Sequence, residues 1–214
     1  MIRVLSFLLL VSFWACKAPE AQNTTQESKK IITAGGTLTE VIYELGFGDQ
    51  IIATDITSTY PKSMQKLPSI GYRNQIKAEG ILALGPDLVL IEEGYLSEDV
   101  IQQLKASQLE IKIFPKPTTV VGTKKLIADL ALYFDVTDKG EEINTSIDKD
   151  MENLNSYLSS QNEMPKAVFV MARGPETVFI AGDKTFASEM FNLAKVEKVA
   201  TGFEEFVPLT PESL

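Results

Sequence analysis

Short apolar runs alternate with amphipathic segments through the first part of the chain. Short strand candidates lie at residues 31–33, 51–54, 88–91 and 110–114, and the one at residues 88–91 is an unbroken apolar run, too short for a helix and typical of a parallel strand covered on both faces. Between them, apolar side chains recur with helical spacing at residues 38–45, 78–84 and 97–107. Strands that alternate with helices predict an α/β fold with a mainly parallel sheet.

Two of these helices carry start signals. Thr37 and Glu40 have the spacing of a capping box, which predicts that Thr37 caps a helix stopped by Gly46. Ser97 is expected to cap the third helix in the same way. The apolar residues that this third helix should turn inward are Val100, Ile101 and Leu104.

Two longer helices are predicted at residues 120–134 and 139–160. The second carries an apolar stripe made of Ile143, Ile147, Met151, Leu154 and Leu158. At the helical rise it would span roughly 33 Å, about the width of a small domain. Such a helix could be a rigid strut between two α/β segments or a helix packed along one sheet, and the stripe fits both.

A second α/β segment follows Pro165. Residues 167–171 predict a strand that pairs with residues 177–180 across a turn, and residues 185–193 predict a helix. The chain ends just after Thr210 and Pro211 open a further helix, so we expect a second lobe that is incomplete at its C-terminal end. The predicted lobes and connection are residues 31–118, 119–160 and 161–214.

The first residues have the form of an export signal. A charged start precedes an apolar run of about a dozen residues, shorter than the ~20 needed to span a bilayer, so residues 1–15 are expected to be a signal peptide. Cys16, the single cysteine, follows directly, and its position resembles the lipidation site of bacterial lipoproteins. An ordinary signal peptide with an incidental cysteine is the alternative. Residues 16–30 have almost no apolar side chains and predict a flexible tether.

Composition excludes several classes of function. A hydrophobic share of 44 % with 23 % charged residues is typical of a folded globular chain. The net charge of −9 and the lack of basic runs argue against nucleic acid as a partner. The sequence has no histidine and no Walker-type or GxGxxG motif, and neighbouring Glu92 and Glu93 should point to opposite sides of an extended segment. We therefore expect no enzyme; an extracytoplasmic carboxylate-dependent enzyme is the alternative from another class.

The loops that follow the predicted strands should share one rim. In parallel sheets, ligands bind beyond the carboxyl ends of the strands. Residues 35–36, 55–60 and 92–95 occupy these positions, and Tyr60 and Tyr72 lie in loops rich in proline and glycine. The rim is the expected ligand site.

Five short motifs in order resemble the haem-binding branch of the helical-backbone substrate-binding proteins. They are Ser58-Thr59-Tyr60-Pro61, Leu67-Pro68, Gly71-Tyr72, Ala78-Glu79-Gly80 and Pro86-Asp87-Leu88. The resemblance implies two lobes joined by a long helix and a monomeric receptor in the periplasm or cell envelope. Such a receptor is held to the membrane through a lipid anchor only and delivers haem, as a transported ligand and not a catalytic cofactor, to an ABC permease. Cobalamin or a ferric siderophore is the nearest alternative cargo.

The same resemblance nominates a ligand site. Gly71-Tyr72 matches a motif whose tyrosine coordinates haem iron in some members, so Tyr72 is the expected axial ligand; a tyrosine packed on its loop is the alternative. Arg73 could serve a haem propionate, and Asn74 stands where the family usually has an arginine. Met171 or Arg173 should face the cleft from the second lobe. The remaining expected ligand contacts are Gly36, Ser58, Tyr60 and Glu93.

Glu79 and Glu212 form a separate pair. Each lies in the first turn of a predicted helix, where a carboxylate also interacts favourably with the helix dipole. In the family that the chain resembles, a glutamate at the matching place in each lobe engages arginines of the permease. Docking to a permease is the role that we expect for both.

Overall fold

A four-stranded parallel sheet forms the centre of the first lobe in the computed structural model, which describes residues 28–174 and 177–209. The strand order is β2-β1-β3-β4, and every neighbouring pair is parallel. The strands are β1 (Ile31–Ala34), β2 (Ile51–Thr54), β3 (Leu88–Glu92) and β4 (Glu110–Phe114). The predicted positions of all four strands and their parallel pairing are confirmed.

Helices cover both faces of this sheet, as the unbroken apolar run at residues 88–91 predicted. Successive strand side chains point to opposite faces. Leu88 and Leu90 lie in one apolar cluster with α1 (Gly36–Ile42) and α4 (Val120–Tyr133). Val89 and Ile91 lie in a second cluster on the other face, which is covered by α2 (Ala78–Leu82) and α3 (Glu98–Ala106). Short helical turns complete the lobe: η1 (Tyr43–Phe47), η2 (Gly48–Gln50), η3 (Met64–Lys66) and η4 (Arg73–Gln75).

The start of α1 differs from its prediction. Gly35 is the N-terminal cap, no side chain caps the helix, and Thr37 lies inside it, so the capping-box prediction is wrong. Gly35 has a φ of 127°, a backbone conformation that favours glycine, and its N–H donates to the carboxylate of Asp55 at 2.9 Å. A distant carboxylate therefore sets this helix start. The cap at Ser97 is confirmed, because its hydroxyl accepts the N–H of Val100.

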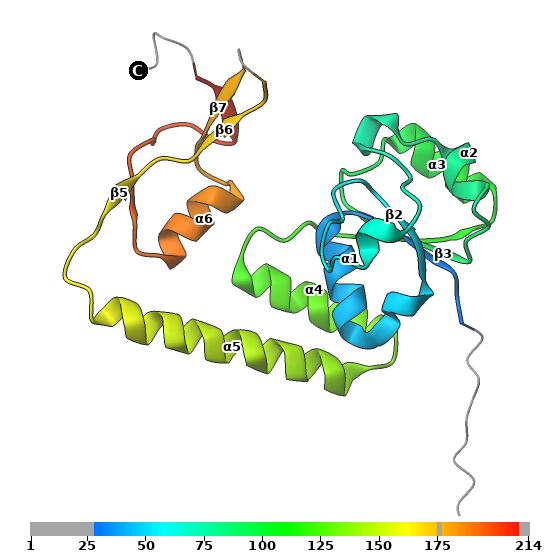
Figure 1. Ribbon diagram of the computed structural model, residues 1–214, viewed down its shortest axis with the longest axis horizontal. Coiled ribbons are helices and arrows are strands. Elements are labelled where there is room, and N and C mark those ends of the chain that lie inside the picture. The colour runs from blue at the N-terminus through cyan, green and yellow to red at the C-terminus, as the bar shows by residue number, and fades with distance from the viewer. Residues whose placement is uncertain (1–27, 175–176, 210–214) are drawn as a thin grey trace, which may run out of the picture.

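One long helix, α5 (Thr137–Ser159), joins the lobes (Figure 1). Its first half packs on α4, where Gly140 is so close that an added Cβ would lie 2.5 Å from the Cβ of Ala131. Ile143 and Ile147 pack against the core of the first lobe. The rest of α5 runs on to the second lobe, which confirms the predicted strut between lobes.

The described part of the second lobe contains two small sheets. β5 (Lys166–Ala167) pairs in parallel with β8 (Glu197–Lys198). The other sheet is antiparallel in the order β6-β7-β9, and its strands are β6 (Val170–Ala172), β7 (Val178–Ala181) and β9 (Phe206–Pro208). The predicted single strand at residues 167–171 is wrong, because the chain changes partners: Ala167 accepts from Val199, and Phe169 accepts from Ala181.

An aromatic cluster connects the antiparallel sheet to α6 (Phe186–Leu193), the helix that Thr185 caps. The ring of Phe169 meets Phe186 edge-on at 5.8 Å and Phe206 at 6.1 Å between centroids. Several large apolar side chains of this lobe stay exposed, among them Val168, Val170, Met190 and Val199. Within residues 28–174 and 177–209, the structure contains no helix of the length and apolarity that a membrane span requires.

Candidate functional site: a cleft between the lobes

A cavity of about 720 Å³ lies between the two lobes. This volume falls within the range of roughly 300–1,000 Å³ that is usual for small-molecule sites. The first lobe contributes Tyr72, Arg73, Asn74, Gln75 and Lys116 to its lining, and the second contributes Met171, Arg173, Phe186, Glu205 and Phe206. Three cations and one carboxylate therefore face this space, in a chain whose net charge is −9.

Tyr72 is held at the cleft by its backbone. The N–H of Ile56 donates to the carbonyl oxygen of Gly71 at 3.0 Å, and the N–H of Gln75 donates to the carbonyl of Tyr72 at 2.8 Å. Gly71 has a φ of 105°, which lets the chain turn between these two bonds. The side chain of Tyr72 is 38 % exposed, so its phenol is available to a ligand.

Arg73, the residue after Tyr72, stacks on the ring of a buried tyrosine, Tyr95. Its guanidinium carbon lies 5.3 Å from the centre of the Tyr95 ring, within the range of a cation–π contact. Tyr95 is buried on the loop after β3. The position of Arg73 in the cleft wall is thus supported by a residue that does not itself line the cleft.

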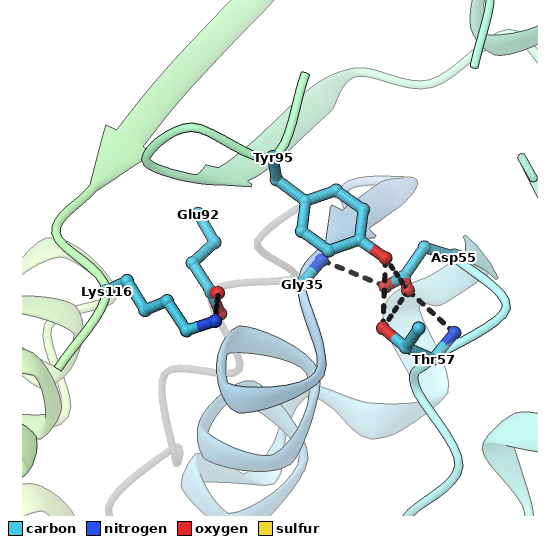
Figure 2. Close-up of polar contacts among 6 residues, drawn as sticks. All are labelled: Gly35, Asp55, Thr57, Glu92, Tyr95 and Lys116. Carbon is cyan, nitrogen blue, oxygen red and sulfur yellow. Dashed lines mark hydrogen bonds and ion pairs between the residues drawn. The ribbon is translucent and has the colours of Figure 1, made fainter. Parts of the chain in front are cut away.

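Asp55 is the centre of a buried polar network that ties three strand ends together (Figure 2). One carboxylate oxygen accepts from the N–H of Gly35, after β1, and from the hydroxyl of Ser58 at 2.6 Å. The other accepts from the N–H of Thr57 at 2.7 Å and from the hydroxyls of Thr57 and Tyr95. The predicted convergence of these three loops on one rim is confirmed.

These hydrogen bonds decide the ionisation of the network. Burial alone would raise the pKa of Asp55, but hydrogen bonds from Ser58, Thr57, Tyr95 and Gly35 favour the anion and hold its pKa below the ordinary value. Burial and the hydrogen bond to the Asp55 carboxylate raise the pKa of Tyr95, so its phenol stays protonated and donates. Asp55 is therefore a stable anion beneath the rim.

Glu92 is a second buried carboxylate, at the end of β3. It is 4 % exposed, and its Oε1 lies 3.5 Å from Nζ of Lys116, whose side chain is 52 % exposed and lines the cleft (Figure 2). Its Oε2 has no hydrogen-bond partner among the described residues. Glu93 is exposed, so the opposite orientations predicted for the two glutamates are confirmed.

The second lobe supplies a mostly apolar wall. Met171 lies on β6, and the rings of Phe186 and Phe206 are backed by Phe169. Arg173 follows β6, and its guanidinium carbon lies 5.9 Å from the centre of the Phe179 ring. This wall can cover an apolar ligand surface and offer one cation at its edge.

Five of the nominated ligand residues come together in the cleft: Tyr72, Arg73, Asn74, Met171 and Arg173. Gly36, Tyr60 and Glu93 do not line it, and Tyr60 is 58 % exposed on the rim loop. Ser58 is buried, and its hydroxyl is already bonded to Asp55 and Thr39, so we do not keep it as a ligand contact.

Of the predicted permease and lipidation residues, the structure describes Glu79, which does not line the cleft. Glu79 is exposed in the first turn of α2, as a docking residue requires. Cys16 and Glu212 lie outside the described residues.

Five lining residues were not anticipated. Gln75 directly follows the motif that was recognised, and Lys116 lies between two prolines in a loop after a strand, which is the signal that could have identified it. Phe186, Glu205 and Phe206 reach the cleft only through the folding of the second lobe. No pattern along the chain distinguishes them from ordinary core or surface positions.

Two α/β lobes, a connecting helix and a lined cleft between them define the class of two-lobed solute-binding proteins. Among residues 28–174 and 177–209, no group of His, Cys, Asp or Glu is arranged to hold a metal ion by itself. The family model described as periplasmic binding protein matches residues 31–214, and the chain belongs to this family.

Relatives and solved structures agree with that assignment. The chain is 26 % identical over 192 residues to the uncharacterised ABC transporter substrate-binding lipoprotein YvrC of Bacillus subtilis (strain 168), covering 88 % of this chain. It is 29 % identical over 178 residues to the vitamin B12-binding protein of Yersinia pestis (strain Pestoides F), covering 81 % of this chain. It spans 61 % of the length of each relative.

A solved structure shares the fold closely. The periplasmic haem-binding protein RhuT from Roseiflexus sp. RS-1, in its apo form, superposes with a TM-score of 0.81 at 28 % sequence identity. The match covers 86 % of this chain and 72 % of that chain. The expected α/β fold and family are thus confirmed.

Proposed function

We propose that the chain is the substrate-binding component of an ABC importer and that its cargo is haem. The observation that carries this proposal is the position of Tyr72, whose half-exposed phenol lines a cleft beside Arg73. Tyrosine is one of the protein ligands of haem iron. The likeness to a haem-binding protein supports the same cargo.

The rest of the cleft fits an amphipathic, acidic ligand. Phe186, Phe206 and Met171 offer apolar contact to a flat macrocycle, while Arg73 and Arg173 offer charge to its acidic groups. Haem combines these two features, because it joins an apolar ring to two carboxylates. Tyr72 would then bind the iron of the cargo, and the protein would bind and release haem without chemical change.

Delivery to a permease completes the proposed role. We infer that the protein is exported to the periplasm or cell envelope, in line with the relative that is named a lipoprotein, and that Cys16 carries its anchor. Glu79, exposed on α2, would dock on the permease together with Glu212.

Cobalamin is the second candidate cargo, because the chain is 29 % identical to a vitamin B12-binding protein. The side-chain amides of Asn74 and Gln75 in the cleft could serve the amides of a corrin. A cobalamin receptor would not need the hydroxyl of Tyr72 as a metal ligand. The two cargoes therefore differ in their dependence on that one oxygen.

Titration of the purified protein with haemin and with cyanocobalamin tests the proposal. Wild type should bind haemin with a shifted Soret band and a phenolate-to-iron charge-transfer band. Tyr72→Phe should lose the charge-transfer band and weaken haemin binding by about tenfold or more, which corresponds to 1.4 kcal/mol or more. Tyr60→Phe is the matched control, because Tyr60 is exposed outside the cleft.

Wild type that leaves the haemin spectrum unchanged would count against haem as the cargo. A Tyr72→Phe protein that keeps both the charge-transfer band and the wild-type affinity would count against Tyr72 as the iron ligand. Binding of cyanocobalamin alone, with equal affinity in wild type and Tyr72→Phe, would assign the cleft to the second candidate.

A further inference from the structure

Lys116 and Glu92 form a charge pair whose cation faces the ligand cleft. The carboxylate is buried at the end of β3, while the ammonium belongs to the loop after β4 and lines the cleft. Nζ of Lys116 lies 3.5 Å from Oε1 of Glu92, and Oε2 of Glu92 has no hydrogen-bond partner among the described residues. Figure 2 shows the lysine side chain reaching to the carboxylate and ending beside it.

A carboxylate buried this deeply is stabilised as an anion either by several hydrogen bonds, as Asp55 is, or by a nearby cation, because removal from water penalises an isolated charge. Lys116 is the partner that the structure gives to Glu92. The pair therefore restricts a long, flexible side chain to one part of the cleft wall. An ammonium has three donors, and a single contact at 3.5 Å leaves it able to bind a further acceptor.

The two arginines of the cleft are placed differently. Arg73 stacks on Tyr95, and Arg173 stacks on Phe179. Among the described residues, Lys116 lies over no aromatic ring, and its half-exposed ammonium is a compact charge supported by an anion. A compact charge suits a single acidic group of a ligand, whereas a stacked guanidinium also covers apolar surface.

We propose that Lys116 binds an acidic group of the cargo and that Glu92 positions Lys116 for this contact. This inference rests on the proposed function: with haem as cargo, the group is one of the two ring carboxylates. Lys116 then determines specificity for acidic ligands. Glu92 acts through Lys116 and does not touch the ligand.

Comparison of haemin with haemin dimethyl ester tests the contact, because the ester keeps the ring and iron but lacks both acidic groups. Wild type should prefer the diacid. Lys116→Met should weaken haemin binding by about tenfold and leave the affinity for the ester unchanged, so the preference falls by the same factor. Lys116→Arg should keep most of the preference for the diacid. Lys105 is an exposed lysine of α3, and Lys105→Met should behave as wild type.

The positioning role of Glu92 is tested by a double-mutant cycle. Glu92→Gln should lower the preference for the diacid, and combining it with Lys116→Met should lower the preference no further than Lys116→Met alone. A purely structural defect would instead weaken binding of diacid and ester equally. If Glu92→Gln does not fold, the variants of Lys116 still test whether this lysine recognises the acidic group, because its half-exposed side chain can be replaced without disturbing the core.

The outcomes separate this inference from the proposed function. Wild type that binds neither porphyrin overturns the proposed function and this inference with it. Haemin bound by wild type, with the same preference for the diacid in Lys116→Met, overturns the role of Lys116 alone. An unchanged preference in a folded Glu92→Gln protein overturns the positioning role and leaves the lysine contact in place.

Discussion

Replacing Asp55 by asparagine should destabilise the first lobe, although it only exchanges one carboxylate oxygen for an amide nitrogen and removes the charge. The carboxylate accepts five hydrogen bonds, two of them from the backbone N–H groups of Gly35 and Thr57. Gly35 donates to one oxygen and Thr57 to the other. An amide offers an acceptor at one position and a donor at the other, so whichever way it is oriented one of these N–H groups meets a donor.

The size of the expected destabilisation follows from the number of hydrogen bonds that the carboxylate accepts. A buried donor left without a partner costs about 1–3 kcal/mol, and hydrogen bonds to a charged acceptor exceed neutral ones by about 1 kcal/mol. The hydroxyls of Ser58 and Tyr95 can rotate to reduce the loss, whereas the backbone donors cannot. We expect Asp55→Asn to lower the free energy of unfolding by about 2–4 kcal/mol at pH 7.

The effect should also depend on pH. The folded state lowers the pKa of Asp55 below its unfolded value of about 3.9, so the carboxylate contributes stability above that pH. This contribution is lost as the pH falls through the folded pKa. The difference in stability between wild type and Asp55→Asn should therefore be complete at pH 7 and shrink as the pH falls below about 4.

Urea unfolding followed by circular dichroism between pH 3 and pH 7 measures both quantities. Asp148→Asn is the matched control, because Asp148 forms an exposed ion pair with Lys124 and should change stability by less than about 1 kcal/mol. An Asp55→Asn protein as stable as the control at pH 7 would show that the Asp55 network does not stabilise the lobe. A difference in stability that grows with acidification would contradict the lowered pKa of Asp55.

Two further predictions concern a helix contact and the permease. Gly140→Ala should destabilise the protein by about 1–3 kcal/mol, because the new Cβ would lie 2.5 Å from the Cβ of Ala131. Gly80→Ala is the control: Gly80 has open space around it in α2, so this change should stabilise the protein by up to about 1 kcal/mol. Equal effects of the two changes in thermal unfolding would contradict the close packing of α4 on α5. Glu79→Lys should abolish haem-dependent stimulation of the permease ATPase without changing haemin affinity, and the exposed Glu98→Lys of α3 should leave it unchanged. Normal stimulation by Glu79→Lys would remove Glu79 from the docking surface.

The sequence predicted the parts of this fold that depend on local patterns. The short segments at β1 to β4 marked parallel strands, the unbroken apolar run at β3 marked a fully buried one, and the stripe from Ile143 marked a long helix. Ser97 capped α3 as expected because a cap involves residues that are close in sequence. The nominated Tyr72 and Arg173 line the same cleft, although they come from different lobes.

Long-range polar contacts were not predictable in the same way. Asp55 bonds Gly35 and Tyr95, which lie 20 and 40 positions away, and no periodicity links the three. The same bond explains the wrong cap at Thr37, since Asp55 takes the N–H of Gly35 and fixes an earlier helix start. Ser58 was nominated as a ligand contact for its place in a loop, but the network takes its hydroxyl inward.

The two walls of the cleft therefore differ in how firmly the fold holds them. On the first lobe, the loop of Tyr72 is tied to Ile56 beside Asp55, and Arg73 stacks on Tyr95, which is bonded to the same carboxylate. On the second lobe, Met171 and Phe206 lie on the two edge strands of a three-stranded sheet. Metal coordination tolerates displacements of only about 0.5 Å, whereas apolar contact is not directional. A metal-containing cargo would thus be coordinated from the first-lobe wall, which the buried Asp55 network holds in place. The second-lobe wall would add apolar contacts.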